Sequence, residues 1–242
     1  MTDTINGPLP PSVFVSAVAT DSGKTFVLRA LTRSASRSGA RVAALKPIET
    51  GVAPDPRDAI ALARAAGRPE LAHAPGLYRA ALPLAPYAVA LETDAQPPDV
   101  ASLIARVREL AVGSDLLLVE GAGGLLVPID RQRTIADLAL GLGLPLLIIA
   151  CDQLGVLSSV LSCVESAQAR RLRVGAVILS QHAQLADDPS PRTNQRILQE
   201  RLSCPVLRFP RCADDDDALA DAAERIGLAA ALHAELRQHP RL

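Results

Sequence analysis

The stretch VFVSAVATDSGKT, residues 13–25, decides the fold of this chain. Its apolar beginning has the pattern of a buried strand that ends near Val18, and a helical pattern begins near Lys24. The polar loop between them would lead to a helix N-terminus, where free backbone N–H groups and the helix dipole favour phosphate. Lys24 supplies a charge for the terminal phosphates of a nucleotide, and Thr25 supplies a hydroxyl for Mg²⁺. The stretch therefore predicts a phosphate-binding loop.

The match to the strict loop pattern is incomplete. The pattern G-x-x-x-x-G-K-[ST] places glycine where this chain has Val18, and glycine there would let the loop turn tightly. A Gly-Lys-Thr triplet also occurs by chance, and the alternative is an ordinary helix start with a solvated lysine. The position after an apolar strand and before a helix favours phosphate binding.

The rest of the chain repeats the alternation of strand and helix. Continuous apolar runs predict strands at 13–18, 42–45, 116–119, 146–150, 174–179 and 206–207, and helical spacing covers 25–38, 99–112, 156–171, 193–202 and 217–232. Strands that are apolar on both faces are typical of parallel sheets covered by helices. We expect a doubly wound, mainly parallel α/β sheet flanked by helices, of the P-loop NTPase type.

Length and composition favour one domain. The 242 residues suffice for a single ATP-binding α/β domain, with residues 1–11 flexible. The stretch 69–98 is the least regular and should hold a helix between loops, and the acidic run 214–217 should solvate a loop and start the last helix.

Composition also excludes several partners. A net charge of -1 and 2% aromatic residues give no indication of nucleic-acid binding. The longest apolar run, 142–151, is too short to cross a membrane. The four scattered cysteines form no zinc-binding pattern and, with no apolar signal segment, indicate a reduced, cytoplasmic protein.

Two polar residues follow the second predicted strand. Lys46 comes directly after that strand, on the edge of the sheet where the phosphate loop lies. Asp58 opens the next helix and has a carboxylate that could hold Mg²⁺. The alternatives are a surface lysine in a turn and an acid that complements a helix dipole.

Glu120 ends the apolar strand at 116–119 and precedes a glycine-rich segment, 121–124. A buried carboxylate needs a partner, and an acid in this place resembles the Walker-B residue that holds Mg²⁺ near a phosphate loop. The glycines would let a phosphate or substrate approach the backbone. We interpret this segment as part of the site.

In this order, the motifs resemble the dethiobiotin synthetase family, ATP-dependent enzymes that close the ureido ring of the biotin precursor. The resemblance extends from Val13 to about Leu228 and depends on TDSGKT (20–25), KPIETG (46–51), DAIAL (58–62), LAPY (84–87) and VEGAGG (119–124). It implies a homodimer that uses ATP and Mg²⁺ to join CO₂ to 7,8-diaminononanoate.

The resemblance also implies roles for individual residues. Lys24 and Lys46 would be catalytic and stabilise phosphate and carbamate oxygens, and Thr25, Asp58 and Glu120 would surround Mg²⁺. The nucleotide would contact Asp21, Ser22, Gly23, Lys24, Thr25, Phe26, Asp58, Glu120, Gly121, Ala122, Gly123, Ser180 and Pro210. The substrate would contact Thr20, Lys46, Thr50, Gly155, Val156, Leu157 and Ser158, the last four at a helix start that reaches across the dimer.

The sequence departs from the family at several of these places. Alanines at 17 and 19 replace a glycine and an acid, Ser180-Gln181 replaces the Asn-Asp that reads the base, and Ser158-Ser159 replaces Asn-His. Three other hypotheses therefore stay open. The chain could be a non-catalytic relative that keeps the fold, or an ATP-dependent ligase with another substrate. It could also be a switch ATPase, although such proteins place a second lysine where this chain has Ala19.

Overall fold

A parallel sheet of six strands forms the centre of the molecule. The computed structural model describes residues 8–181 and 187–232, so most of the expected flexible N-terminus, 1–7, lies outside the described residues. The strand order is β2-β5-β1-β6-β7-β8, and every pair is parallel. The bounds are β1 Ser12–Ala17, β2 Val42–Leu45, β5 Leu116–Glu120, β6 Leu146–Cys151, β7 Val174–Ser180 and β8 Val206–Phe209. The prediction of a doubly wound parallel sheet is confirmed.

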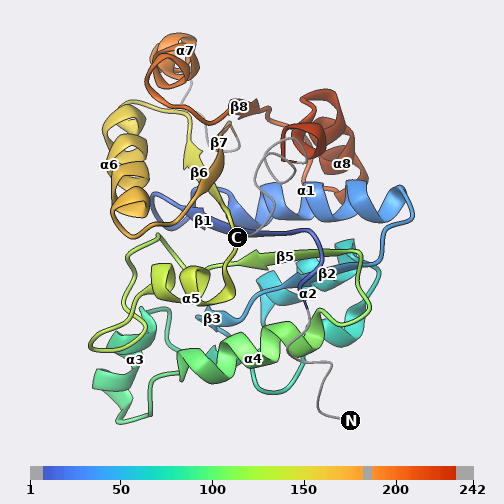
Figure 1. The fold of residues 1–242 in the computed structure, drawn as a ribbon, viewed down its shortest axis with the longest axis vertical. Coiled ribbons are helices and arrows are strands. Elements are labelled where there is room, and N and C mark those ends of the chain that lie inside the picture. Colours follow the sequence, from blue (N-terminus) through green and yellow to red (C-terminus); the bar gives the residue numbers. More distant parts are fainter. Residues whose placement is uncertain (1–7, 182–186, 233–242) are drawn as a thin grey trace.

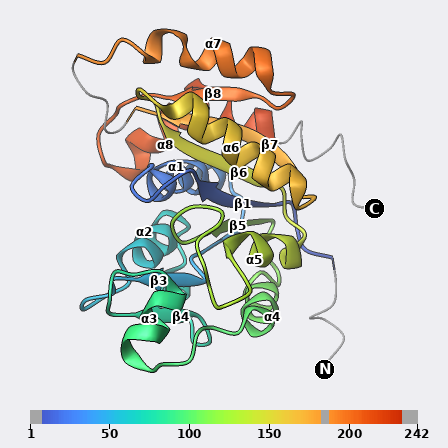
Figure 2. The same ribbon diagram turned by 90° about the vertical axis from the view of Figure 1, so that its left-hand side faces the viewer.

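Helices cover both faces of the sheet, as Figures 1 and 2 show. Alternate residues of β1 enter different cores: Val13 and Val15 pack with α1 and α8, whereas Phe14 packs with α4, α5 and α6. This alternation explains why β1 is apolar throughout. The helix bounds are α1 Lys24–Arg37, α2 Arg57–Ala65, α4 Val100–Leu110, α5 Ile135–Leu142, α6 Val156–Ala169, α7 Pro191–Arg201 and α8 Asp216–Arg225.

A second, two-stranded parallel sheet joins β3, Ile48–Thr50, to β4, Tyr78–Ala80. It lies beside α2 and α3 at the lower end of the molecule in both views (Figures 1 and 2). Neither strand was predicted from the sequence, because three residues are too few to show a periodic pattern. The irregular stretch contains the expected helix, α3 at Pro86–Thr93, together with β4 and a 3₁₀ turn at Pro69–Leu71.

Two helices differ from their sequence predictions. Helix α5 was not predicted, because its eight mostly apolar residues lie close before the apolar run of β6 and could not be told apart from it. A capping box formed by Thr134 and Asp137 begins this helix. Helix α8 ends at Arg225, and helical residues resume at 228–232, up to the predicted end at Leu232. The break between them contains Gly227, whose φ of 65° is a left-handed conformation that interrupts the helix.

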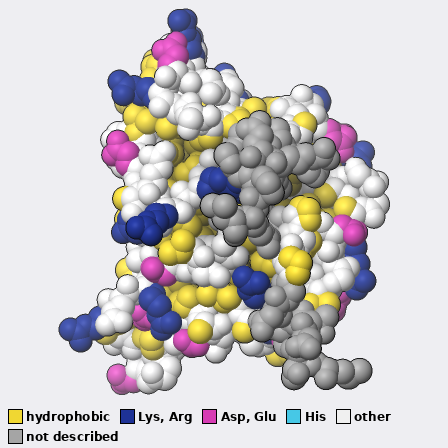
Figure 3. Space-filling view, in the orientation of Figure 1, with side chains coloured by type: hydrophobic (Ala, Val, Ile, Leu, Met, Phe, Trp, Pro, Cys, Tyr) yellow, Lys and Arg dark blue, Asp and Glu magenta, His cyan; other side chains and the backbone are white. Residues whose placement is uncertain are grey.

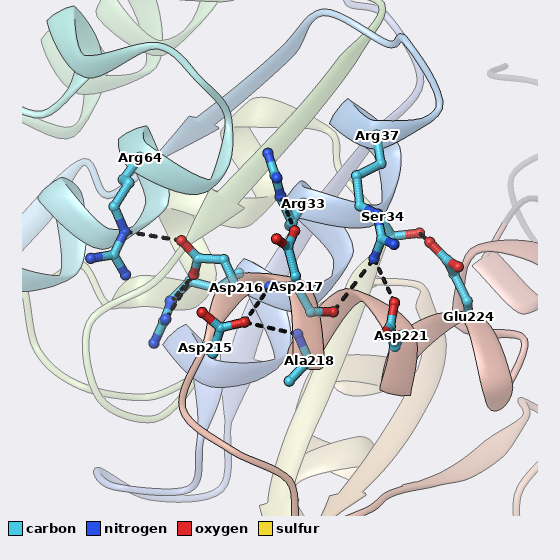
Figure 4. A network of polar contacts seen from close by, with 11 residues as sticks. Arg33, Ser34, Arg37, Arg64, Asp215, Asp216, Asp217, Ala218, Asp221 and Glu224 are labelled. Atoms are coloured by element: carbon cyan, nitrogen blue, oxygen red, sulfur yellow. Dashed lines mark hydrogen bonds and ion pairs between the residues drawn. The ribbon is translucent and has the colours of Figure 1, made fainter.

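A row of arginines on α1 binds the acidic start of α8. Arg29 contacts Asp214 and Asp216, Arg33 contacts Asp217, and Arg37 contacts Asp221; Figure 4 shows most of this network. Arg64 of α2 also binds Asp216 at 2.9 Å. The acidic run does begin α8, with Asp215 as its N-cap, but it bonds to arginines in addition to facing solvent.

The surface shows no expanse of one charge on the face drawn in Figure 3, where acidic, basic and apolar side chains are interspersed. Among the described residues, each helix is too short or too polar to cross a membrane.

The arginine row gives a stability prediction. We expect Arg29→Ala to lower the free energy of unfolding by about 1–2 kcal/mol, because its side chain is 9% exposed and holds two carboxylates. Arg33→Ala is the matched control, because the side chains of its ion pair, Arg33 and Asp217, are 37% and 60% exposed. We expect this variant to lose less than about 0.5 kcal/mol of unfolding free energy, and the loss should disappear in high salt. Urea unfolding measures both, and equal losses would contradict the assignment.

Candidate functional site

The phosphate-binding loop leaves β1 at Ala17 and enters α1 at Lys24. Within this fully described loop, positive φ angles are confined to Asp21, at 56°, and Gly23, at 89°. Glycine adopts this conformation freely, and aspartate does so more readily than most residues. Val18 needs no positive φ, so valine in place of the pattern's first glycine is compatible with the observed loop.

The N-terminus of α1 faces this loop without a side-chain cap, because Gly23 occupies the N-cap position. The hydroxyl of Ser22 donates instead to the carbonyl of Ala19 at 2.9 Å, within the loop itself. The first N–H groups of a helix have no partner in the helix. The loop and the start of α1 can therefore bind an anion through backbone N–H groups.

Four side chains from four elements meet beside the loop. Lys46 follows β2, and its Nζ lies 2.5 Å from Oε1 of Glu120, at the end of β5, and 2.9 Å from Oδ2 of Asp58 on α2. The hydroxyl of Thr25 on α1 donates to the same Glu120 oxygen at 2.8 Å. Lys46 is 5% exposed and Glu120 is fully buried. The structure thus brings together the residues that the sequence placed at one edge of the sheet.

These contacts decide the charge of the site. Burial favours the neutral form of Lys46, but the charges of Glu120 and Asp58 outweigh it and hold the pKa of this lysine above its ordinary value. Burial would raise the pKa of Asp58, yet the charge and hydrogen bond of Lys46 lower it overall. Burial and the charge of Lys46 lower the pKa of Lys24. The site therefore holds charged groups of both signs in a desolvated place, where electrostatic interactions are strong.

The carboxylates suit a hard cation that also binds a nucleotide. Within the described residues, Oε2 of Glu120 is buried and has no hydrogen-bond partner. No cluster of three or more His, Cys, Asp or Glu side chains in this part of the chain forms a complete metal site. Mg²⁺ is usually bound by one or two carboxylates, water and substrate phosphates. Glu120, Asp58 and the hydroxyl of Thr25 fit that kind of incomplete protein site.

A cleft of about 640 Å³ opens over this cluster. The predicted site residues that line it are Thr20, Asp21, Gly23, Lys24, Thr25, Phe26, Lys46, Thr50, Asp58, Glu120, Ala122 and Gly123. Most of the proposed nucleotide and metal residues therefore face one space, together with three of the proposed substrate residues, Thr20, Lys46 and Thr50.

Close packing requires glycine at two positions after Glu120. A Cβ on Gly121 would lie 2.9 Å from Ile135 and 3.0 Å from Phe14, and one on Gly124 would lie 3.2 Å from the carbonyl oxygen of Ala17. These contacts are tighter than a side chain tolerates without a shift in its neighbours. Both glycines let the segment after β5 pack closely, and Gly124 packs it against the start of the phosphate loop.

The remaining predicted residues lie outside the lining of the cleft. Ser22 and Gly121 are close in sequence to lining residues, Ser180 ends β7, Pro210 follows β8, and Gly155, Val156, Leu157 and Ser158 begin α6. Gly155 is the N-cap of α6 and gives that helix no side-chain cap. A second anion-compatible helix start therefore exists, apart from the phosphate-loop cleft.

A buried polar network joins the start of α6 to the ends of β7 and β8. Asp152 is 1% exposed; its carboxylate accepts from Asn194 at 3.0 Å and lies 2.9 Å from Nε of Arg208 on β8. Its backbone N–H donates to the carbonyl of Ser180 at 2.9 Å. The network fixes the segments that the sequence analysis assigned to substrate and base.

The cleft also contains residues that the sequence analysis did not select. Glu49, Arg29, Asp214 and the segment 83–86 line it. Arg29 lies one turn after Phe26 on α1. Asp214 is 185 residues away from Arg29 in the sequence, and the tertiary fold brings the two together. The LAPY motif, 84–87, belongs to the family resemblance, but no role was predicted for it. Glu49 is a buried acid within the KPIETG motif, and an acid in that motif is the signal that could have identified it as a cleft residue.

Comparisons with known proteins agree on one family. A family model described as an AAA domain matches residues 11–210. An ATP-dependent dethiobiotin synthetase of Caulobacter vibrioides is 42% identical over 213 residues, which are 85% of this chain and 94% of that protein. Enzymes of the same name from an Anaeromyxobacter species and Aquifex aeolicus are 39% and 34% identical, covering 74% and 84% of this chain and 79% and 90% of those proteins.

Solved structures agree on the fold. The cell division ATPase MinD of Pyrococcus furiosus superposes with a TM-score of 0.55 at 14% identity, over 90% of this chain and 99% of that one. Chloroplast FtsY of Physcomitrella patens gives 0.52 at 16% identity, over 90% and 66%. At these identities the likeness concerns architecture alone, and it confirms the P-loop NTPase type of fold.

The buried ion pair gives a second stability prediction. We expect Lys46→Ala to cost about 3 kcal/mol of unfolding free energy, because it leaves the buried Glu120 carboxylate without its cation. Adding Glu120→Gln should recover most of that loss, since the double variant leaves only the Asp58 carboxylate without its lysine, and that side chain is 40% exposed. Chemical denaturation of the wild type, both single variants and the double variant tests this. Additive losses would show that the pair is not coupled.

Proposed function

The chain belongs to the ATP-dependent dethiobiotin synthetase family, and from this premise we propose that its phosphate-loop cleft closes the ureido ring of dethiobiotin. The reaction would take 7,8-diaminononanoate, CO₂ and ATP and release ADP and phosphate. The observation that carries the proposal is the meeting of Lys46, Asp58, Glu120 and Thr25 beside an uncapped helix N-terminus.

The chemistry needs no protein nucleophile. One amine of the substrate first forms a carbamate with CO₂. A carbamate oxygen then attacks the terminal phosphorus of ATP, giving a mixed carbamic-phosphoric anhydride and ADP. The second amine attacks the carbamoyl carbon, phosphate leaves, and the ring closes with loss of a proton. Each step gathers negative charge on oxygens, so preorganised cations beside those oxygens lower the barrier.

The residues divide this work by position. Lys24 starts α1 beside the anion-compatible loop and would hold the terminal phosphates. Lys46 lies deeper, fixed by two carboxylates, and would stabilise oxygens passing between carbamate and phosphate. Thr20 and Thr50 line the same cleft and would donate hydroxyl hydrogen bonds to the carbamate.

Thr25, Asp58 and Glu120 would hold Mg²⁺. When bound, this ion would neutralise charge on the nucleotide phosphates. The buried, unpartnered Oε2 of Glu120 and the cleft-facing Asp58 support this assignment. Lys46 bonds to both carboxylates, so part of the negative charge is already balanced by the protein.

The separation of two helix starts supports a homodimer. The start of α6, residues 155–158, lies outside the lining of the phosphate-loop cleft, yet it is uncapped and suits a carboxylate. We propose that α6 of one protomer holds the far carboxylate of a substrate whose amines lie in its partner's cleft. Leu154 beside this helix start is 82% exposed, and Leu84 at the cleft is 39% exposed.

We also propose that the protein works in the cytoplasm, because the free cysteines of this chain suit a reducing compartment.

The retained charges argue against a degenerate relative. A protein that had lost catalysis would have no reason to keep a desolvated Lys46 between two carboxylates, because apolar residues in that place are often at least as stable. A switch ATPase is also disfavoured, since Ala19 occupies the place of the second lysine of such proteins. Substrate-dependent turnover separates both from the proposed enzyme.

We expect the wild type to release ADP only when diaminononanoate and bicarbonate are both present. Lys46→Ala should lower turnover at least about 100-fold, because it removes charge stabilisation from the transition state. Two variants are controls. Lys46→Arg keeps the positive charge at this position in a folded protein, and Arg33→Ala should retain wild-type turnover. Circular dichroism verifies the fold. Unchanged activity in Lys46→Ala would remove this lysine from the mechanism, and a wild type without substrate-dependent ADP release would refute the proposed reaction.

The dimer proposal has its own test. We expect sedimentation of the wild type to give a dimer, and Leu154→Asp to shift it towards monomer while reducing turnover, because a charge would be buried at the contact. Leu91→Asp is the matched control, since Leu91 is 67% exposed on α3 and outside the cleft lining. A fully active monomer would contradict a shared site.

A further inference from the structure

The small β3–β4 sheet, which begins two residues after Lys46, carries an acid and a base at opposite positions of its two strands. Glu49 of β3 and Arg79 of β4 are register partners. Glu49 is 6% exposed, and Arg79 is half-buried. Neither side chain bonds to Lys46 Nζ or to the Asp58 carboxylate, but each contacts the backbone of one member of that ion pair. The proposed function above gives no role to either residue.

The Glu49 carboxylate caps helix α2. Oε1 accepts from the backbone N–H of Asp58 at 2.9 Å, and Oε2 accepts from that of Ala59 at 3.1 Å. The residue at the N-cap position of α2 is Pro56, which provides no side-chain cap. A helix leaves its first four N–H groups without intrahelical partners, so Glu49 supplies from another element the acceptors that a local cap would provide.

Arg79 holds the other end of the ion pair. Its Nη1 donates to the carbonyl of Lys46 at 2.9 Å and to the carbonyl of Tyr78 at the same distance. Arg79 therefore fixes the backbone of Lys46, and Glu49 fixes the backbone of Asp58. Residues 51–55, which connect β3 to α2, are exposed or half-exposed, and the N–H groups of Gly51 and Val52 donate to the carbonyls of Leu82 and Ala80 at 3.0 and 2.9 Å.

We propose that Glu49 is a positioning residue, which sets the start of α2 and thereby holds the Asp58 carboxylate against Lys46. The inference rests on the proposed function of the cleft, since it assigns Glu49 a part in that chemistry through Asp58. Glu49 also lines the cleft, so direct substrate contact is the competing explanation. Both of its carboxylate oxygens are already engaged by N–H groups of α2, and this favours positioning.

The two explanations predict different couplings. A residue that acts only through Asp58 loses its effect when Asp58 is removed, whereas a residue that touches substrate keeps its effect. We expect Glu49→Ala to lower kcat about 10- to 100-fold, because small displacements of a catalytic group are costly. In an Asp58→Ala background, Glu49→Ala should lower kcat by less than about twofold further. Glu49→Gln keeps an acceptor for one N–H and should recover part of the activity.

Asp99→Ala is the matched control for loss of a cap. Asp99 caps α4 by accepting from the N–H of Ser102 at 2.9 Å, and it does not line the cleft. We expect Asp99→Ala to lower stability as Glu49→Ala does, since both remove a helix cap, with unchanged kcat. Amide hydrogen exchange at Asp58 and Ala59 should accelerate in Glu49→Ala and not in Asp99→Ala.

Equal losses from Glu49→Ala with and without Asp58 would overturn the proposal, and so would full activity of Glu49→Ala. Should the wild type fail to turn over diaminononanoate, the proposed reaction fails separately. The same four-variant cycle is then measured on Mg²⁺-dependent ATP affinity by calorimetry. Additive effects there, or hydrogen exchange at Asp58 and Ala59 that Glu49→Ala leaves unchanged, would reject the positioning role on its own.

Discussion

The buried ion pair between Lys46 and Glu120 is the constraint around which the site is organised. Neither group tolerates burial alone, because a desolvated charge without a partner is strongly unfavourable. Glu120 is fully buried and Lys46 is 5% exposed, so the ends of β2 and β5 must stay in register for either to be accommodated. Their strands are direct neighbours, with Leu45 opposite Val119. The parallel sheet thus places the two charges side by side, and α1 and α2 add Thr25 and Asp58 around them.

This arrangement favours catalysis more than stability. An apolar pair of similar volume would often pack in the same space at no greater cost, so the presence of these charges supports the catalytic role proposed for Lys46. Lys46 is held by carboxylates at its Nζ and by Arg79 at its carbonyl. A lysine so fixed needs little reorganisation when charge develops on a nearby oxygen, and preorganised charge is the largest source of rate enhancement in many enzymes.

The sequence predicted the large sheet and most of the cleft because both depend on local patterns. Strands buried on two faces are apolar throughout, and Lys46 and Glu120 follow such strands directly. Glu49, Arg29 and Asp214 were missed for a different reason: their roles arise from contacts between separate elements, which no local pattern predicts. Arg29 and Asp214 are 185 residues apart, and Glu49 caps a helix that begins several residues later. The sequence could not show whether valine at position 18 is compatible with a phosphate-binding loop, because that depends on backbone geometry. The structure has positive φ angles within the loop only at Asp21 and Gly23, so Val18 is compatible with it.

The same physical rule organises the other half of the molecule. Asp152, directly after β6, is buried and contacts the buried Asn194 of α7 and the half-buried Arg208 of β8, so a second desolvated carboxylate fixes the ends of neighbouring strands. It joins the start of α6 to Ser180, where the family pattern has an asparagine. The backbone at this position is held whichever side chain it carries, because the N–H of Asp152 donates to the carbonyl of Ser180. The side chain at position 180 can therefore differ from the family pattern while the ends of β6 and β7 keep their geometry, and this network shares no residue with the ion pair at Lys46.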